Sequence, residues 1–597
     1  MELDIAGRVI RSYDNAGYAT TTEYHPLLDK PAKVTDALGN TTCYAYDERG
    51  RKVAEWGTAV QPACFAYDEA DRLLSLTTFR APGEFIDSDP RTRTDGDTTS
   101  WVYHETTGLE LEKIYADGSR VLKSYDTFNL PASETDARGV VKTHTREIAR
   151  GLLLSTTYSD DTEPGYFTYN HLARLTQQRD AAGTRTIAYT PFGEVESEEL
   201  LADGVTHTIT EHYDEFGRST GYTYAKNGVQ QQRVSTGYDE YGSISTAGFE
   251  HRGEEKNFRF SYLPGTHSLH KLEHPSSITL TQEYEDERVI LASMSYHRGS
   301  TLVAQRSYTY DALGRPMQRN TARNGGVVHD TFAHNTRSEL TEAQVNGGSY
   351  TYAYDNIGNR ESAQEAAASA TLYETNALNQ YTAVGDFTPQ FDAAGNQTLV
   401  KTNTGIWRVT YNAENRPTRF ESEDGCTVVQ CAYDTKGRRC YKKVTTQGET
   451  TLHQRYIYRG YLQIACCDLT RATHPALWYI LWDPTQPTAT RPLAIQKDGT
   501  WYTYGWDLTK NICEIYDSSG YIRTIYTYSP YGAVTADGDV VQPLQWSSEF
   551  YDTVLGLVYY NYRYYNFIST WTSKDHVPSY NTYIYIPIMH LFTALTT

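Results

Sequence analysis

The sequence lacks several features that mark common protein classes. It has no apolar run that reaches the ~18 residues of a transmembrane helix and no long amphipathic helical pattern. Hydrophobic residues make up only 39% of the 597 positions, which disfavours a thick conventional core. The N-terminus has neither the basic nor the apolar region of a signal peptide. Residues 1–8 already resemble a turn of the repeat described below, so we expect a piece of a longer protein.

Motifs for metal binding and catalysis are also missing. The eight cysteines form no C-x-x-C and match no zinc spacing, so they are interpreted as thiols packed in strands, with any disulfide between neighbouring strands left open. H-E-x-x-H, G-x-S-x-G, P-loop and dinucleotide motifs are absent, and no cofactor is predicted. Asp87–Pro90 and Asp95–Asp97 resemble a calcium loop but lack the EF-hand spacing and its final glutamate. A solvated acidic loop near residues 81–100 is the better interpretation.

The charge balance excludes one class of partner. The formal net charge is −20 and the isoelectric point is near 5.3. Nucleic-acid binding requires clustered lysine and arginine, so binding of nucleic acid by this chain is disfavoured, as is an anionic membrane surface. An acidic surface instead keeps a large β protein soluble and discourages association of sheet edges.

Tyrosine is abundant, with 51 residues, and much of it belongs to a repeated phrase. The phrase consists of two aromatic residues with one residue between them, then Asp, two free positions, Gly and often a basic residue. Its clearest copies are Tyr308–Arg315 and Tyr352–Asn359. The aromatic residue before the turn recurs with spacings of 22, 22, 19, 18, 20 and 22 residues, at Tyr310, Phe332, Tyr354, Tyr373, Phe391, Tyr411 and Tyr433. A period in this range is typical of a repeat architecture.

The phrase predicts a β-hairpin. Two aromatic residues separated by one position share a face of a strand because side chains alternate. Asp at the first position and Gly at the fourth fit a type I turn, with the carboxylate accepting hydrogen bonds from the turn backbone. We expect the ring of each tyrosine to be buried and its hydroxyl to remain in water. One hairpin is marginal alone, but many in series can pair laterally into one long sheet.

The hairpin signals extend over most of the chain, in which thirteen Asp-x-x-Gly turns occur. We assign repeats to residues 1–262, irregular repeats or an insertion to 263–306, and regular repeats to 307–445. A core-like segment is assigned to 446–580 and a degenerate short tail to 581–597. The predicted fold is therefore all-β, with the hairpins paired into one long sheet. The family resemblance given below implies that this sheet curves and spirals into a partial hollow shell with a C-terminal plug.

The tail carries a specific resemblance. It contains Ser529-Pro530-Tyr531-Gly532, then Tyr551-Asp552, and then Gly556–Tyr565, which reads GLVYYNYRYY. This order resembles the core associated with RHS repeats, and the tyrosine–aspartate phrase resembles the YD repeat of the same proteins. The family includes bacterial polymorphic toxins, the C component of insecticidal toxin complexes and animal teneurins.

The resemblance implies a β-sheet strip wound into a shell that encloses a variable C-terminal toxin or effector. In many members the core caps the shell and acts as an aspartic autoprotease that releases this tail. Other members are cell-surface or wall-associated proteins that make contacts or bind carbohydrate. The resemblance therefore implies a secreted or cell-surface bacterial protein whose partner is an enclosed effector segment, a glycan or a receptor.

The end of the chain departs from the family pattern. Lys574-Asp575 matches the Arg-Asp pair that the family uses for self-cleavage, so these two residues are the candidate catalytic residues. The neighbouring Pro and Gly-Arg of the pattern are replaced or lost, and no cleavage signal follows. Aspartic chemistry needs two carboxylates that share a proton. The sequence places no partner for Asp575, which favours a degenerate plug in which Asp575 is not catalytic.

Three functions follow, in order of preference. The first is a non-enzymatic shell or scaffold that encloses or presents an effector in the full-length system. The second is a surface adhesion module that binds glycans through exposed aromatic residues, although tyrosine and tryptophan more often form cross-strand pairs that hold a sheet together. The third is a self-cleaving peptidase that releases its own C-terminus through Asp575.

Overall fold

The structure is a computed structural model that describes residues 1–80, 88–486 and 490–568. Within these ranges the chain consists of strands, turns and two short 3₁₀ helices, and it contains no α-helix. The predicted all-β fold is confirmed.

The first 34 strands are β1 (Glu2–Leu3), β2 (Val9–Tyr13), β3 (Ala19–Tyr24), β4 (Pro31–Thr35), β5 (Thr41–Tyr46), β6 (Lys52–Trp56), β7 (Ala63–Tyr67), β8 (Leu73–Thr78), β9 (Asp97–Tyr103), β10 (Glu110–Ile114), β11 (Arg120–Tyr125), β12 (Pro131–Thr135), β13 (Val141–Arg146), β14 (Leu153–Tyr158), β15 (Gly165–Tyr169), β16 (Leu175–Asp180), β17 (Gly183–Tyr189), β18 (Val195–Ala202), β19 (Val205–Tyr213), β20 (Ser219–Lys226), β21 (Val229–Tyr238), β22 (Ile244–His251), β23 (Glu254–Tyr262), β24 (Leu269–Glu273), β25 (Ile278–Tyr284), β26 (Leu291–Arg298), β27 (Thr301–Tyr310), β28 (Pro316–Arg323), β29 (Gly326–His334), β30 (Leu340–Val345), β31 (Gly348–Tyr354), β32 (Arg360–Glu365), β33 (Thr371–Thr375) and β34 (Tyr381–Val384). A second sheet contains β35 (Gln390–Phe391), β36 (Gln397–Thr402), β37 (Gly405–Tyr411), β38 (Pro417–Ser422), β39 (Thr427–Tyr433), β40 (Arg439–Thr446), β41 (Glu449–Arg459), β42 (Leu462–Asp468), β43 (Ala476–Trp482), β44 (Pro492–Lys497), β45 (Thr500–Trp506), β46 (Ile512–Tyr516), β47 (Ile522–Tyr528) and β48 (Val534–Gly538). A small third sheet contains β49 (Phe550–Asp552), β50 (Leu557–Tyr560) and β51 (Arg563–Tyr565), and the 3₁₀ helices are η1 (Pro90–Thr92) and η2 (Trp546–Ser548).

The strands pair in the simplest possible order. Each strand of the two long sheets is antiparallel to the next one along the chain, for example β27 with β28 and β39 with β40. The two long sheets are therefore meanders, with one row of turns after the odd-numbered strands and another after the even-numbered strands. We call these two rows the odd rim and the even rim.

The predicted turn chemistry is present at Asp311. The Gly314 amide donates to the Asp311 carbonyl oxygen at 3.0 Å, and Gly314 has a φ of +77°, which explains the glycine. The Asp311 carboxylate accepts the amides of Leu313 at 2.9 Å and Arg315 at 3.0 Å. The Arg315 guanidinium closes an ion pair with Asp311 at 2.5 Å and donates to the Asn335 carbonyl oxygen of the next odd-rim turn at 3.0 Å. The basic residue thus joins successive hairpins along the rim.

The tyrosine hydroxyls differ from the expectation that they remain in water. In the repeat that ends at Tyr411, the hydroxyl donates to the Gln397 carbonyl oxygen at 2.9 Å, and the same bond joins Tyr284 to Leu269 at 2.8 Å. In each case the tyrosine ends its strand and the acceptor is the first residue of the preceding strand. This prediction was wrong because strand starts leave backbone carbonyl oxygens that need a donor. The tyrosines therefore fasten each hairpin to the one before it.

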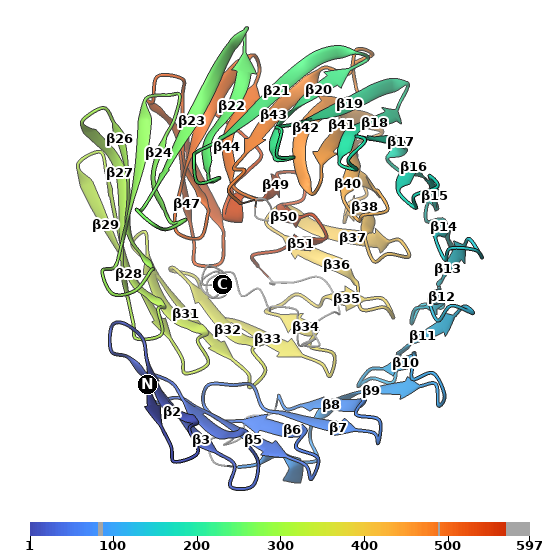
Figure 1. The fold of residues 1–597 in the computed structure, drawn as a ribbon, viewed down its shortest axis with the longest axis vertical. Coiled ribbons are helices and arrows are strands. Elements are labelled where there is room, and N and C mark those ends of the chain that lie inside the picture. Colours follow the sequence, from blue (N-terminus) through green and yellow to red (C-terminus); the bar gives the residue numbers. More distant parts are fainter. Residues whose placement is uncertain (81–87, 487–489, 569–597) are drawn as a thin grey trace.

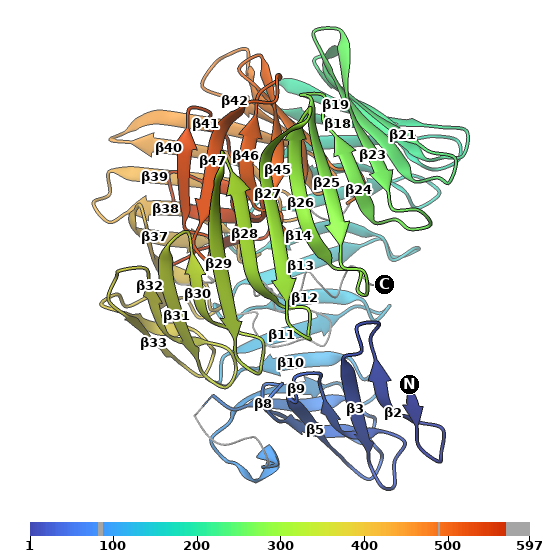
Figure 2. The same ribbon diagram turned by 90° about the vertical axis from the view of Figure 1, so that its left-hand side faces the viewer.

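The strip winds through about two turns of a spiral, seen as a ring in Figure 1. Side-chain hydrogen bonds between the turns join residues 295 positions apart at Arg80–Thr375, 248 apart at Arg459–Glu211 and 177 apart at Tyr354–Tyr531. The sequence separation between contacting residues falls along the chain, so each full turn of the spiral contains progressively fewer residues. Figure 2 shows the second-turn strands β37–β40 on one side of the first-turn strands β18–β23, so the turns are also displaced along the axis.

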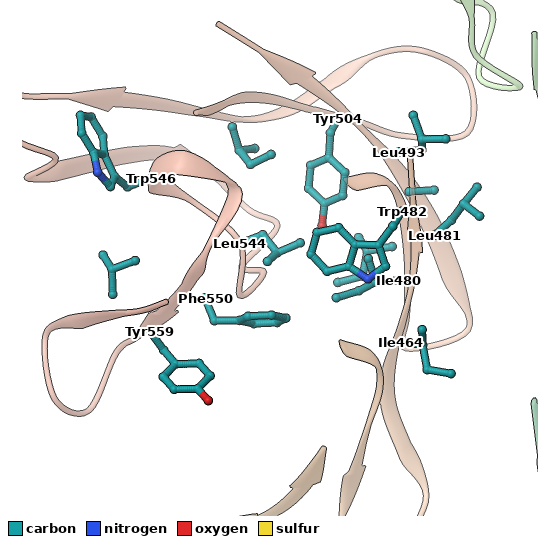
Figure 3. Close-up of a cluster of buried hydrophobic side chains, with 14 of the residues drawn as sticks. Ile464, Ile480, Leu481, Trp482, Leu493, Tyr504, Leu544, Trp546, Phe550 and Tyr559 are labelled. Atoms are coloured by element: carbon teal, nitrogen blue, oxygen red, sulfur yellow. The ribbon is translucent and has the colours of Figure 1, made fainter. Parts of the chain in front are cut away.

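A thick core exists only where the turns overlap. One cluster of buried side chains joins Phe258 and Tyr296 of the first turn, Tyr504 of the second, and Phe550 and Tyr559 near the C-terminus. Figure 3 shows part of it. By contrast, the cluster between β7 and β8 has only three buried members: Ala63, Phe65 and Leu76. The low hydrophobic content disfavoured a thick core, and that expectation is wrong where the two turns overlap.

Candidate functional site at the seat of the C-terminal segment

After β48 the chain leaves the second sheet and returns to it as a separate layer. The segment 539–568 carries η2 and β49–β51, and Figure 1 shows β49–β51 within the ring of strands. Its seat is formed by β36–β40. Asn403 donates to the Tyr551 hydroxyl at 3.0 Å, and Asn566 donates to the Lys401 carbonyl oxygen at 2.8 Å. The C-terminal part of the described chain is therefore held from inside the wall.

A buried charge cluster lies at the centre of this seat. The Asp552 carboxylate contacts Lys442 Nζ at 2.6 Å and the Arg439 guanidinium at 3.1 Å, and all three side chains are at most 6% exposed. Burial by itself would raise the pKa of Asp552, but Lys442 and Arg439 outweigh it and hold the pKa below its usual value. The ionised Asp552 therefore bridges the segment to two cations of β40.

Tyrosines surround the Arg439 guanidinium. It lies 4.3 Å from the centre of the Tyr559 ring, 5.0 Å from that of Tyr456 and 5.7 Å from that of Tyr564. The Arg439 amide donates to the Tyr559 hydroxyl at 2.6 Å, and its guanidinium donates to the Tyr564 hydroxyl at 2.7 Å. The tail motif thus supplies two rings and one carboxylate to a single arginine. An ionised carboxylate that is paired with two cations has no proton to donate, so Asp552 is not suited to general acid catalysis. The arrangement instead suits anchoring of the segment to β40.

A second charge pair joins the segment to the turn between β45 and β46, where Glu549 is buried and Lys510 is half-buried. Lys510 Nζ is 2.7 Å from the Thr490 hydroxyl and 3.8 Å from the Glu549 carboxylate, which also accepts a hydrogen bond from Thr490. Burial raises the pKa of Glu549 to about 7 and lowers the pKa of Lys510 below its usual value. Glu549 therefore changes its protonation state near neutral pH.

The described chain ends beside a buried arginine. The Tyr373 hydroxyl donates to the Ile568 carbonyl oxygen at 3.1 Å and accepts from the Arg360 guanidinium at 3.3 Å. Arg360 also lies 4.2 Å from the centre of the Tyr531 ring, and the Tyr565 hydroxyl donates to the Tyr531 carbonyl oxygen at 2.7 Å. The tyrosine of the P-Y-G motif and a tyrosine of the tail motif therefore meet at the exit of the segment.

The predicted catalytic residues Lys574 and Asp575 lie outside the described residues. The sequence by itself did not identify Asp552, Arg439 and Lys442 as a unit. Asp552 belongs to the quoted tail motif, which was the available signal for it, whereas the two cations lie on a strand 110 and 113 positions earlier. Only the return of the segment onto β40 brings the three together.

The aromatic residues proposed for sugar binding are mostly unavailable. Five tryptophans of the C-terminal region were candidates for stacking on sugar rings. Trp478 is half-buried, and the other four are buried: Trp482, Trp501, Trp506 and Trp546. Five of the eight cysteines are buried: Cys431, Cys440, Cys466, Cys467 and Cys513. The described ranges contain no group of three or more potential metal ligands and no helix long and apolar enough to cross a membrane.

Comparisons with known proteins agree with this geometry. The model of the teneurin YD-shell family matches residues 266–589. The tRNA3(Ser)-specific nuclease WapA of Bacillus spizizenii is 26% identical over 234 residues, which are 38% of this chain and 9% of that protein. Among solved structures, TcdB2-TccC3-Cdc42 matches 96% of this chain with a TM-score of 0.73 and 18% identity, and TcdB2-TccC3 without its hypervariable C-terminal region matches with a TM-score of 0.72 and 18% identity. The chain covers 34% of each of these two solved chains.

Proposed function

Because the chain belongs to the teneurin YD-shell family, we propose that it forms the wall of a container for a C-terminal effector segment. The observation that supports this function is the position of β49–β51, which are anchored within the ring by the Asp552 cluster. Any polypeptide that continues from this anchor starts from the inner side of the wall. In this proposal the chain is a scaffold, and residues 446–580 act as its core and plug.

The setting proposed for this container is extracellular. Members of the family named by the resemblance include toxins and surface proteins, and the structural neighbours include a toxin-complex chain. The effector segment would be the main partner, with a surface receptor or glycan as a further one. The chain covers only about a third of the length of the solved chains that it matches. In this proposal, other polypeptide completes the container.

The test measures whether the tail is shielded from protease. Trypsin cleavage after Lys574 is followed by mass spectrometry in the full-length protein, with the unfolded chain as reference. We expect cleavage at least ten-fold slower in the folded protein, and faster cleavage in Asp552→Asn, which removes the anchor. Equal rates in the folded and unfolded wild-type protein would show that the tail is outside and would reject the container.

A further inference from the structure

One buried arginine differs from the others in its partners. Five arginines of the described chain are at most 4% exposed. Four of them form an ion pair with a carboxylate: Arg306 with Glu514, Arg438 with Asp434, Arg439 with Asp552 and Arg455 with Asp203. The fifth, Arg360, is 3% exposed and pairs with no carboxylate of residues 1–80, 88–486 or 490–568. A charge that is removed from water is strongly disfavoured unless an opposite charge accompanies it, so Arg360 requires an anion.

Tyrosines surround Arg360 but supply no negative charge. The guanidinium lies 4.2 Å from the centre of the Tyr531 ring, 5.1 Å from that of Tyr352 and 5.5 Å from that of Tyr373. Burial raises the pKa of Tyr352 above its usual value, so this side chain stays neutral. Arg360 Nη1 donates to the Tyr373 hydroxyl at 3.3 Å, whereas Nε is buried without a hydrogen-bond partner. The tyrosines therefore orient the guanidinium and leave one edge of it unused.

The nearby carboxylates of the described chain do not neutralise Arg360. Glu365 lies on the same strand, β32, but no ion pair joins it to Arg360 within the described residues. Burial raises the pKa of Glu365 and outweighs the opposite effect of Arg360. Glu339, in the turn between β29 and β30, pairs with Arg337 at 3.2 Å. The anion for Arg360 must therefore come from elsewhere.

The described chain ends beside this cation. The Ile568 carbonyl oxygen accepts a hydrogen bond from the Tyr373 hydroxyl at 3.1 Å, and the same hydroxyl accepts from Arg360. Three acidic residues lie outside the described ranges: Glu84, Asp87 and Asp575. Of these, Asp575 follows Ile568 by seven positions, and seven residues span at most roughly 25 Å when extended. Asp575 is thus the acidic residue whose chain starts next to Arg360.

We infer that Arg360 is the binding site for the Asp575 carboxylate. A guanidinium that donates through Nε and Nη2 matches the two oxygens of a carboxylate, and Nη1 is already used by Tyr373. Arg360 is then a positioning residue that holds the tail to β32, as Arg439 and Lys442 hold Asp552 to β40. A carboxylate paired with a guanidinium stays ionised, which favours anchoring over the shared proton of aspartic catalysis. The pairing rests on the proposed container, because the tail must continue within the wall.

A double-mutant cycle in the full-length protein tests the pairing. Hydrogen exchange read by mass spectrometry follows the amides of residues 569–580. Asp575→Asn should raise their exchange roughly ten-fold when Arg360 is present and have almost no effect in Arg360→Met, in which no buried cation remains. The matched control, Glu84→Gln/Asp87→Asn, removes the other two acidic residues and should leave the exchange unchanged. Equal effects of Asp575→Asn in both backgrounds, no effect in either, or a rise in the control that depends on Arg360 would each overturn the inference.

A second measurement keeps Arg360 in place and does not depend on the folding of Arg360→Met. Formate is a carboxylate small enough to replace the side chain that Asp575→Ala removes. It should raise the thermal midpoint of Asp575→Ala by roughly 1–2 °C, whereas chloride at the same ionic strength should not. In the wild type formate should have no such effect, because Asp575 occupies the site. An equal rise in the wild type would assign the site to free anions, and no rise in either protein would remove the site; both results would overturn the inference. Trypsin protection at Lys574 separates this inference from the container: loss of protection rejects both, whereas protection without coupling in the cycle rejects the pairing alone.

Discussion

Replacing Asp552 by asparagine should release the C-terminal segment from the wall while the two sheets stay folded. The carboxylate is the anionic partner of both Lys442, at 2.6 Å, and Arg439, at 3.1 Å, and each of these side chains is at most 6% exposed. Removing one partner of a buried ion pair costs about 3–5 kcal/mol, because the remaining charge is left uncompensated. Here two cations would remain.

The structure indicates where this cost will appear. Residues 539–568 form a separate layer, so the least costly response is for this layer to detach and let water reach Lys442 and Arg439. A loss of about 3 kcal/mol corresponds to roughly a hundred-fold larger detached population, at 1.36 kcal/mol per factor of ten. The matched control is Asp539→Asn, because Asp539 pairs with Arg523 at the surface, where an ion pair contributes little.

Hydrogen exchange read by mass spectrometry measures this population. In Asp552→Asn the amides of β49–β51 should lose about two orders of magnitude of protection, in keeping with the detached population. The amides of β20–β23 should exchange as in the wild type, and Asp539→Asn should show no change in either region. Unchanged exchange in β49–β51 would refute the anchoring role, and an equal rise in β20–β23 would show that the cluster supports the whole fold instead.

Three further predictions concern other parts of the chain. Burial raises the pKa of Glu549 from 4.5 to about 7. The contribution of this residue to the free energy of unfolding is therefore complete below pH 4.5 and is lost as the pH rises through 7. Between these limits the free energy of unfolding should fall by roughly 3 kcal/mol, and thermal melts from pH 5 to 8.5 should show a flatter profile for Glu549→Gln; parallel profiles would contradict the assignment. Tyr411→Phe should cost about 1 kcal/mol in urea denaturation by leaving a carbonyl oxygen without its donor, whereas Tyr241→Phe, at an exposed turn, should change nothing; equal effects would argue against the tyrosine bonds. If the Lys574-Asp575 pair supports self-cleavage, purified full-length protein should show a band shift that Asp575→Asn abolishes, and an intact mass after long incubation would remove that activity.

The sequence predicted the local structure because the interactions that specify a turn join residues that are close in sequence. The carboxylate of Asp311 and the backbone of Gly314 build their turn within four residues, so the spacing alone predicted the hairpin. Pairing of neighbouring strands follows from the short turns between them. The resemblance drawn from the tail motif was also carried by residues close in sequence, and it correctly identified the family.

Contacts between the two turns of the spiral depend on the curvature of the sheet, which no local sequence pattern predicts. The separation of contacting residues falls from 295 to 177 positions along the spiral, and this shift determines which side chains of the two turns meet. It brings Arg306 of the first turn to Glu514 of the second and returns Asp552 to Arg439. Because each such pair depends on the summed twist of many hairpins, the buried charge cluster forms only in the folded chain.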